Sequence, residues 1–246
     1  MIKVLINGIL GKMGTEVANM VKKEPKMHLL GGLDKYTSHN LSYPVFNNVE
    51  DIFEAPDVII DFSVPEATIA LLPYITNKKI PTVIATTGFS KEEQEQIYKT
   101  SSQVPIFQSA NLSFGIHLLK QIIVELSQKL PKDTEIEIVE THHNQKKDAP
   151  SGTAISIAES INKANSRAYY YNLERFSQSK KREKKEIGFS SIRGGNIVGE
   201  HSVLFFRDNE TIEIKHTAYS RNIYAEGALK AAMFIIKKEA GYYTEY

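Results

Sequence analysis

Histidine and lysine residues gather in one short segment in the second half of the chain. His142-His143 and Lys146-Lys147 stand within six positions. Histidine can give or take a proton near neutral pH, and lysine adds positive charge. The segment ends in Ser151-Gly152-Thr153, where Ser151 can cap a new helix and the free N–H groups of its first turn suit a carboxylate. These residues predict a site where proton donors meet an acidic substrate.

Two other interpretations of this segment are weaker. A metal site is not expected, because adjacent histidines point in different directions and no acidic third ligand follows at a recognised spacing. A polar surface loop would account for one histidine. It accounts less well for two histidines, two lysines and a Ser-Gly-Thr cap within 12 residues.

A run of glycines near the N-terminus, Gly8-Ile9-Leu10-Gly11-Lys12-Met13-Gly14, predicts a nucleotide-binding turn. It follows an apolar strand and opens a helix, so its backbone can approach a pyrophosphate. Asp34 ends the next expected strand, where an acid that binds a ribose hydroxyl is expected, and Lys35 can meet the 2′-phosphate of NADP. The pair predicts use of both NADH and NADPH. The alternative is a tight turn without a ligand, because the commoner spacing is G-x-G-x-x-G.

The first 110 residues alternate between short apolar runs and helical patterns. Strands are expected at 2–6, 27–33, 58–60, 81–85 and 104–107, with helices at 12–23, at 65–77 and after Ser90. Strands that are apolar throughout and separated by helices predict a Rossmann-type, doubly wound α/β domain, whose parallel sheet is covered on both faces. Thr86-Thr87-Gly88 ends the fourth strand and is a candidate ligand contact, although an ordinary polar loop is the alternative.

The pattern changes after Asn111. A helix is expected from about 116 to 130, and residues 135–140 and 211–217 alternate as strands of an open sheet do. This half therefore predicts a separate α+β domain with an open mixed sheet. The charged run at 180–185 is expected to be a solvated loop, and a last helix is expected at 225–238.

Composition excludes several classes of protein. The 246 residues include 41% hydrophobic and 24% charged residues, with a net charge of +1, which is typical of a globular chain and gives no general attraction to nucleic acid or membranes. The absence of cysteine excludes disulfides and thiolate chemistry. No apolar run approaches the roughly 20 residues that span a bilayer, and no signal-peptide pattern opens the chain. A cytoplasmic protein is expected.

Four segments together resemble one family. They are residues 8–14 (GILGKMG), 83–89 (VIATTGF), 140–153 (ETHHNQKKDAPSGT) and 193–201 (RGGNIVGEH), and residues 217–232 are also similar. In these motifs the chain resembles the 4-hydroxy-tetrahydrodipicolinate reductase (dihydrodipicolinate reductase) family. The resemblance spans nearly the whole chain, and the third motif is the most specific.

The resemblance implies an oxidoreductase that reduces a cyclic unsaturated dicarboxylate with NADH or NADPH, on the route to diaminopimelate and lysine. It implies a dinucleotide-binding domain at 1–111 and 222–246, and a substrate-binding and oligomerisation domain at 112–221, through which the family forms homotetramers. It implies that His142 and Lys146 are catalytic and that His143, Gly152 and Thr153 bind the substrate. The nucleotide-binding residues that it implies are Gly8, Ile9, Leu10, Gly11, Lys12, Met13, Asp34, Thr86, Thr87, Ser109, Ala110, Asn111 and Leu112.

The chain departs from the family pattern at some of these positions. Ala85, counted with the nucleotide-binding residues, replaces a usual glycine, and Leu112 replaces a larger, usually aromatic residue. Two other functions stay open. One is a different two-domain dehydrogenase of an amino-acid pathway, against which the segment 140–153 argues. The other is a redox sensor that binds NAD(P) without catalysis and so does not need His142 or Lys146.

Overall fold

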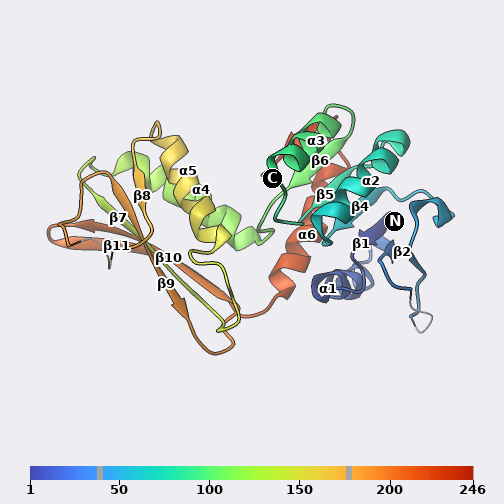
Figure 1. Ribbon diagram of the computed structural model, residues 1–246, viewed down its shortest axis with the longest axis horizontal. Coiled ribbons are helices and arrows are strands. Elements are labelled where there is room, and N and C mark those ends of the chain that lie inside the picture. Colours follow the sequence, from blue (N-terminus) through green and yellow to red (C-terminus); the bar gives the residue numbers. More distant parts are fainter. Residues whose placement is uncertain (38–40, 176–178, 246) are drawn as a thin grey trace. The chain divides into compact units, whose positions relative to one another are not determined.

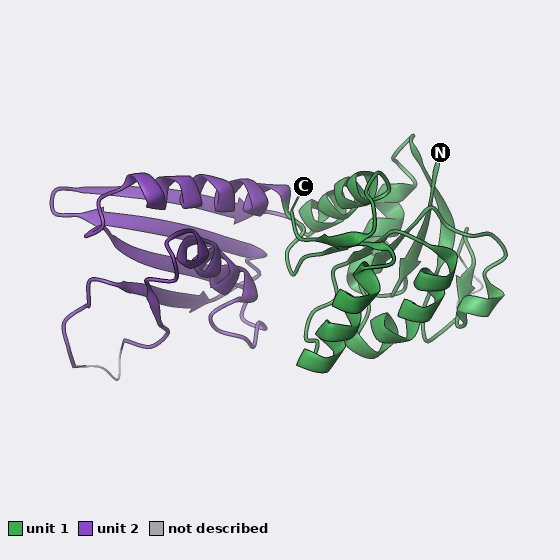
Figure 2. Cartoon of the chain, turned by 90° about the horizontal axis from the view of Figure 1, so that it is seen from above, with its two compact units in different colours: residues 1–113, 221–246 green, residues 114–220 purple. Residues whose placement is uncertain are grey.

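The structure is a computed structural model that describes residues 1–37, 41–175 and 179–245. The chain divides into two compact units (Figure 2). Unit 1 consists of residues 1–113 and the segment that begins at Arg221, and unit 2 is Phe114–Ser220. Each unit has its own sheet and its own hydrophobic core.

Unit 1 is built on a seven-stranded sheet in the order β12-β6-β5-β4-β1-β2-β3, in which every neighbouring pair is parallel (Figure 1). Its elements are β1 (Ile2–Asn7), α1 (Lys12–Val21), β2 (Met27–Leu33), β3 (Val45–Phe46), a 3-10 turn η1 (Val49–Asp51), β4 (Val58–Asp61), α2 (Pro65–Lys78), β5 (Thr82–Ile84), α3 (Lys91–Ser101), β6 (Pro105–Gln108), α6 (Asn222–Ile235) and β12 (Gly241–Tyr243). The strand order reverses between β1 and β4, and doubly wound sheets bind their ligands at such a reversal.

Helices cover both faces of this sheet. Successive residues of each strand point to opposite sides of the sheet, so neighbouring apolar residues pack against helices on different faces. Val4 and Ile6 of β1 belong to a core with α1 and α6, whereas Leu5 belongs to a second core with α2 and α3. At the start of α3, the Ser90 hydroxyl accepts a hydrogen bond from the backbone N–H of Glu93, and the Glu93 carboxylate accepts one from the backbone N–H of Ser90. The predicted doubly wound domain is confirmed.

Unit 2 is built on a five-stranded sheet in the order β11-β10-β7-β9-β8. β10 is antiparallel to β7 and β11, whereas β9 is parallel to β7 and β8, so the sheet is mixed. The elements of the unit are α4 (Phe114–Lys129), β7 (Glu135–His142), α5 (Gly152–Ala164), β8 (Tyr170–Asn172), β9 (Glu186–Arg193), β10 (Gly199–Arg207) and β11 (Glu210–Ala218).

The two faces of the unit 2 sheet differ. Ile136 and Ile138 of β7 belong to a core with residues of α4 and α5. Val139 and its cross-strand neighbours point the other way, and Ile192 on that face is 51% exposed. The predicted α+β unit with an open mixed sheet is confirmed.

The charged run at 180–185 is not simply solvated, which corrects the expectation from the sequence. Arg182 donates hydrogen bonds to the backbone carbonyls of Ile136 and Glu186 and to the carboxylate of Glu137, and its side chain is only 15% exposed. Its guanidinium offers five donors in a fixed planar arrangement, so it can join the ends of β7 and β9. Lys180, by contrast, makes an exposed ion pair with Glu183.

In the part of the chain that the structure describes, no helix has the length and apolar composition needed to cross a membrane.

Candidate functional site

The glycines that follow β1 hold a turn that side chains would not allow. Gly8 has φ +79°, in the left-handed region, and a methyl group there would lie 2.5 Å from the Phe62 carbonyl oxygen. A methyl group at Gly14 would lie 2.1 Å from the Gly8 carbonyl oxygen. Gly11 is the N-cap of α1 and carries no side chain with which to cap it. The first-turn N–H groups of α1 can therefore bind an anion that approaches this turn.

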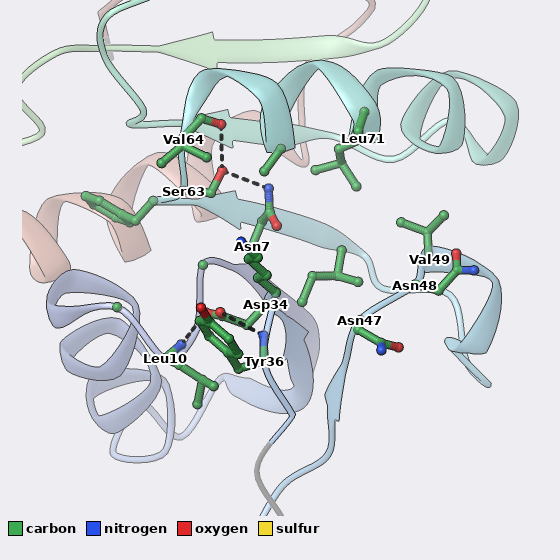
Figure 3. A pocket seen from close by; sticks show the side chains of 17 residues that line it. Asn7, Leu10, Asp34, Tyr36, Asn47, Asn48, Val49, Ser63, Val64 and Leu71 are labelled. Atoms are coloured by element: carbon green, nitrogen blue, oxygen red, sulfur yellow. Dashed lines mark hydrogen bonds between the residues drawn. The ribbon is translucent and has the colours of Figure 1, made fainter.

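A cavity of about 720 Å³ opens where β1, β2 and β4 end (Figure 3). Among the residues expected to bind a nucleotide, five line it: Gly8, Leu10, Gly11, Asp34 and Lys35. Oδ2 of Asp34 accepts a hydrogen bond of 2.9 Å from the backbone N–H of Leu10, which joins the end of β2 to the glycine turn. The cavity lies at the strand-order reversal and presents a carboxylate beside a helix N-terminus, so the residues present fit a dinucleotide.

Other expected nucleotide contacts lie in the core or at the surface. Ile9 is fully buried in the core with α1 and α6, and Met13 packs against that core. Lys12 is the exposed first residue of α1. The turn 8–14 therefore presents its backbone, with Leu10, to the cavity, while Ile9 anchors it.

Two more expected segments follow β5 and β6. Thr86 is 5% exposed, and its hydroxyl accepts a hydrogen bond of 3.0 Å from the backbone N–H of Ser63, which lines the cavity. Leu112 is 2% exposed and belongs to the core with α1 and α6. As far as the described residues show, the cavity lining includes none of the expected residues after β5 and β6, namely Ala85, Thr86, Thr87, Ser109, Ala110, Asn111 and Leu112.

The sequence did not indicate a buried cluster around Asp61, the last residue of β4. One carboxylate oxygen accepts hydrogen bonds from the Asn7 amide, at 3.0 Å, and from the backbone N–H and hydroxyl of Ser63. The other accepts one from the Thr68 hydroxyl at 2.5 Å. Asp61 is fully buried, and burial raises its pKa, against which these hydrogen bonds act. The Asp61 cluster thus joins the ends of β1 and β4 to the start of α2, beneath the cavity.

Replacing Asp61 with alanine is expected to lower the free energy of unfolding by at least about 2 kcal/mol, because several buried donors would lose their acceptor. Urea unfolding of the whole chain measures this. Asp51→Ala, at an exposed position of η1, is the control and should change the midpoint little. Equal midpoints for the two variants would contradict the structural role given to Asp61.

In unit 2, His142 lies in a buried network. Its Nδ1 is 2.5 Å from Oε2 of Glu140, and the two side chains are 8% and 1% exposed. Arg193 of β9 donates two hydrogen bonds to the same carboxylate, from Nη1 at 2.8 Å and from Nη2 at 2.7 Å. The backbone N–H of Ser151 donates another. Although burial opposes it, hydrogen bonding from His142 and Arg193 holds the pKa of Glu140 far below its usual range, so this carboxylate is ionised.

The start of α5 contacts the same network. The Ser151 hydroxyl caps the helix by accepting a hydrogen bond from the backbone N–H of Ala154, and it lies 3.0 Å from Nε2 of His201. The rings of His142 and His201 make an edge contact, with centroids 5.1 Å apart. Burial, with a smaller effect of His142, lowers the pKa of His201 to about 3, so His201 is neutral at physiological pH.

Lys146 lies in the loop between β7 and α5. Its Nζ is 3.0 Å from the carboxylate of Asp148, and the backbone N–H of Gly152 lies near enough to that carboxylate to favour its ionised form. Burial opposes ionisation of Asp148, but these contacts outweigh it and lower its pKa. His143 is half-buried, and its carbonyl accepts a hydrogen bond from the backbone N–H of Lys146. This loop therefore already holds one carboxylate between an ammonium group and the first turn of α5.

The structure brings most of the expected substrate residues into this part of unit 2, confirms Ser151 as the cap of α5, and adds three residues that the sequence did not single out: Glu140, Arg193 and His201. A signal for Glu140 was present, because alternation along β7 places it on the same face as Ile136 and Ile138, where a charge needs a partner. Thr153 is half-buried in the first turn of α5. Among the described residues, no group of three or more His, Cys, Asp or Glu side chains could hold a metal ion.

Comparisons with known proteins match the whole chain. A family model described as "Dihydrodipicolinate reductase, N-terminus" matches residues 2–112, and one described as "Dihydrodipicolinate reductase, C-terminus" matches residues 115–245. Two similar relatives, both named 4-hydroxy-tetrahydrodipicolinate reductase, come from Caldanaerobacter subterraneus subsp. tengcongensis and Clostridium tetani. Each is 45% identical over 244 residues, which cover 99% of this chain and 96% and 95% of the relatives.

Solved structures show the same fold. A dipicolinate-bound dihydrodipicolinate reductase from Paenisporosarcina sp. TG-14 has a TM-score of 0.81 at 24% identity and covers 100% of this chain and 98% of its own. A myo-inositol dehydrogenase from Corynebacterium glutamicum has a TM-score of 0.62 at 13% identity, with 98% and 90% covered. At these identities the likeness concerns the fold alone.

Proposed function

Since the chain belongs to the dihydrodipicolinate reductase family, we propose that it reduces 4-hydroxy-tetrahydrodipicolinate to tetrahydrodipicolinate with NADH or NADPH, as a step toward diaminopimelate and lysine. When bound, the nicotinamide supplies the hydride. The dinucleotide occupies the cavity of unit 1, with its diphosphate at the glycine turn and its ribose at Asp34. The residues after β5 and β6, from Ala85 to Thr87 and from Ser109 to Leu112, complete the nucleotide site.

The observation that supports the substrate assignment is that unit 2 binds the carboxylate of Asp148. Lys146 binds it and the backbone N–H of Gly152 lies near it, so this corner of unit 2 has the donors that a substrate carboxylate needs. A substrate carboxylate binds these donors in place of the Asp148 carboxylate, with Thr153 and His143 as further contacts. The reaction consumes one hydride and one proton and releases the 4-hydroxyl of the substrate as water. Lys146 donates the proton, and His142 gives or takes a proton beside it.

The test is a spectrophotometric assay that follows the nicotinamide absorbance band. The protein is mixed with NADPH or NADH and with the product of the synthase that precedes this step. Oxidation of the nucleotide that depends on this product is expected. A protein that binds NADPH tightly but oxidises none of it would instead be the redox sensor. Oxidation that depends on another amino-acid-pathway substrate would indicate a different two-domain dehydrogenase.

Lys35→Ala is expected to weaken NADPH binding about tenfold and NADH binding little. Lys35 lines the cavity next to Asp34, where it can bind a 2′-phosphate, and the loss of one charged hydrogen bond amounts to about 1.5 kcal/mol. Calorimetric titration with both nucleotides measures the change. Lys23→Ala, at an exposed position outside the cavity lining, is the control. Equal losses for NADH and NADPH would remove Lys35 from the 2′ position.

We also propose that the protein is a cytoplasmic homotetramer that assembles through the open face of the unit 2 sheet. Apolar side chains on that face support this assembly, since large exposed apolar surfaces usually bind a partner. They are Val139, Ile192, Leu204 and Phe206. Light scattering during gel filtration tests the assembly. Ile192→Glu should lower the measured mass, and an unchanged mass would contradict this interface.

A further inference from the structure

His142 has two ring nitrogens, and the assignment of a catalytic role does not say which of them serves the substrate. A neutral imidazole carries one hydrogen, so one nitrogen donates and the other accepts. An imidazole side chain without a partner exchanges readily between the two tautomers, so the nitrogen that faces a ligand is sometimes the donor and sometimes the acceptor. A buried partner on one side fixes the tautomer, because that partner either accepts or donates.

The partner on the Nδ1 side of His142 can only accept. Glu140 is ionised, and a carboxylate in that state has no hydrogen to give. Each of its oxygens is already bound by donors, Arg193 on both and the Ser151 backbone N–H on one. The contact of 2.5 Å between Oε2 and Nδ1 therefore requires the hydrogen to be on Nδ1.

Arg193 keeps the carboxylate in place. It binds both oxygens of Glu140 with its two terminal nitrogens, and Nη2 also donates to the backbone carbonyl of Asp148 at 2.6 Å. Two parallel hydrogen bonds fix the plane of the carboxylate as well as its position. The same guanidinium thus connects the partner of His142 with the loop that carries Lys146.

Residue 199, which lies beside Nε2 of His142, is a glycine. A methyl group at Gly199 would lie 3.0 Å from Nε2 and 3.3 Å from the neighbouring ring carbon. Real methyl groups rarely come so close without a shift of their neighbours. Gly199 opens β10, next to the end of β7, so the absence of a side chain there leaves room beside Nε2.

We propose that Glu140, held by Arg193, is a positioning residue that keeps a hydrogen on Nδ1 of His142 and leaves Nε2, beside Gly199, as the nitrogen that exchanges a proton with the substrate. This inference rests on the proposed function for the identity of the substrate but not for the tautomer. His201 does not compete for this role, because its Nε2 lies against the Ser151 hydroxyl.

The tautomer of His142 is measured directly in protein carrying 13C,15N-labelled histidine, with the ring signals assigned by His142→Asn. In the wild-type protein, the neutral form of His142 should carry its hydrogen on Nδ1, the reverse of the form that free histidine prefers. Neutral His142 with its hydrogen on Nε2 would overturn the inference. The measurement needs no activity, so it remains decisive if the wild-type protein fails the reductase assay, which would count against the proposed function instead.

Kinetics test the consequence for the reaction. Glu140→Gln replaces one acceptor oxygen by an NH2 group, so the tautomer of His142 with its hydrogen on Nδ1 should no longer dominate. The variant is expected to lower kcat about 10- to 100-fold, while KM stays within about threefold of the wild type. Glu135→Gln, on the same strand and outside this network, is the control and should match the wild type. A Glu140→Gln enzyme with wild-type kcat would overturn the positioning role.

A second variant acts on the other nitrogen and covers the case in which Glu140→Gln does not fold. Gly199→Ala brings a methyl group against Nε2 and leaves Glu140 untouched. It should lower kcat/KM at least about tenfold while the signals of His142 still show the hydrogen on Nδ1. Full activity in Gly199→Ala would contradict the use of Nε2.

Discussion

Replacing Lys146 with alanine should lower kcat about 10²- to 10⁴-fold, the range expected when a positioned proton donor is removed. Lys146 belongs to unit 2, whereas the cavity proposed for the nucleotide is formed by residues of unit 1. Binding of NADPH should therefore stay within about twofold of the wild type. The measurements are steady-state kinetics with both substrates and a fluorescence titration with NADPH alone.

Lys147→Ala is the matched control, since Lys147 is the exposed neighbour in the same loop. It removes the same charge from the chain and should retain near wild-type kcat. A parallel loss of NADPH affinity in Lys146→Ala would assign the lysine to the nucleotide site instead. A wild-type kcat in that variant would remove it from the reaction altogether.

Gly14→Ala should have the largest effect on the nucleotide site. The added methyl group would lie 2.1 Å from the Gly8 carbonyl oxygen and 2.8 Å from the Ile9 Cα, both backbone atoms that cannot rotate away. Helix α1 must move outward, which should lower the free energy of unfolding by about 1–3 kcal/mol. The same movement displaces the first-turn N–H groups from the diphosphate, so NADPH should bind at least about tenfold more weakly.

Thermal unfolding and a NADPH titration measure both parts of this prediction. Gly194→Ala is the matched control, because a methyl group at Gly194 meets no atom within 4 Å and its φ is not positive. If Gly14→Ala keeps the wild-type melting temperature and NADPH affinity, the tight contact between α1 and the glycine turn has no energetic importance.

The sequence predicted what depends on local pattern and missed what depends on distant partners. Apolar strands and helical spacing identified the doubly wound unit, and the glycine spacing identified the turn where β1 enters α1. The Asp61 cluster was missed because Asn7, on the neighbouring strand β1, lies 54 positions from Asp61 and meets it only through the order of the strands, although Ser63 and Thr68 are close to Asp61 in sequence. The strand β12 was missed for a similar reason, since a segment of three residues becomes a strand only by pairing with β6.

In unit 2 the sequence identified the loop but not its support. His142 and Lys146 stood out because their side chains can exchange protons. Arg193 did not, because its function depends on the parallel register that places it beside His142, 51 positions earlier. The same limit applies to Arg182, which lies in a run of charges that suggested a solvated loop, although its guanidinium binds three backbone carbonyls.

The discontinuous chain of unit 1 has a consequence for its synthesis on the ribosome. The last strand, β12, and the helix α6, whose buried alanines complete one core, are translated only after all of unit 2. At roughly 5–20 residues per second, the first 113 residues wait roughly 5–25 s for these elements. During that interval β6 is an unpaired edge and one face of the nascent sheet is covered only by α1, while unit 2, which is continuous in sequence, already has every residue it needs to fold. The nascent chain should therefore need chaperone protection mainly for its first half, and a truncation before Asn222 should leave that half prone to aggregation while unit 2 is complete.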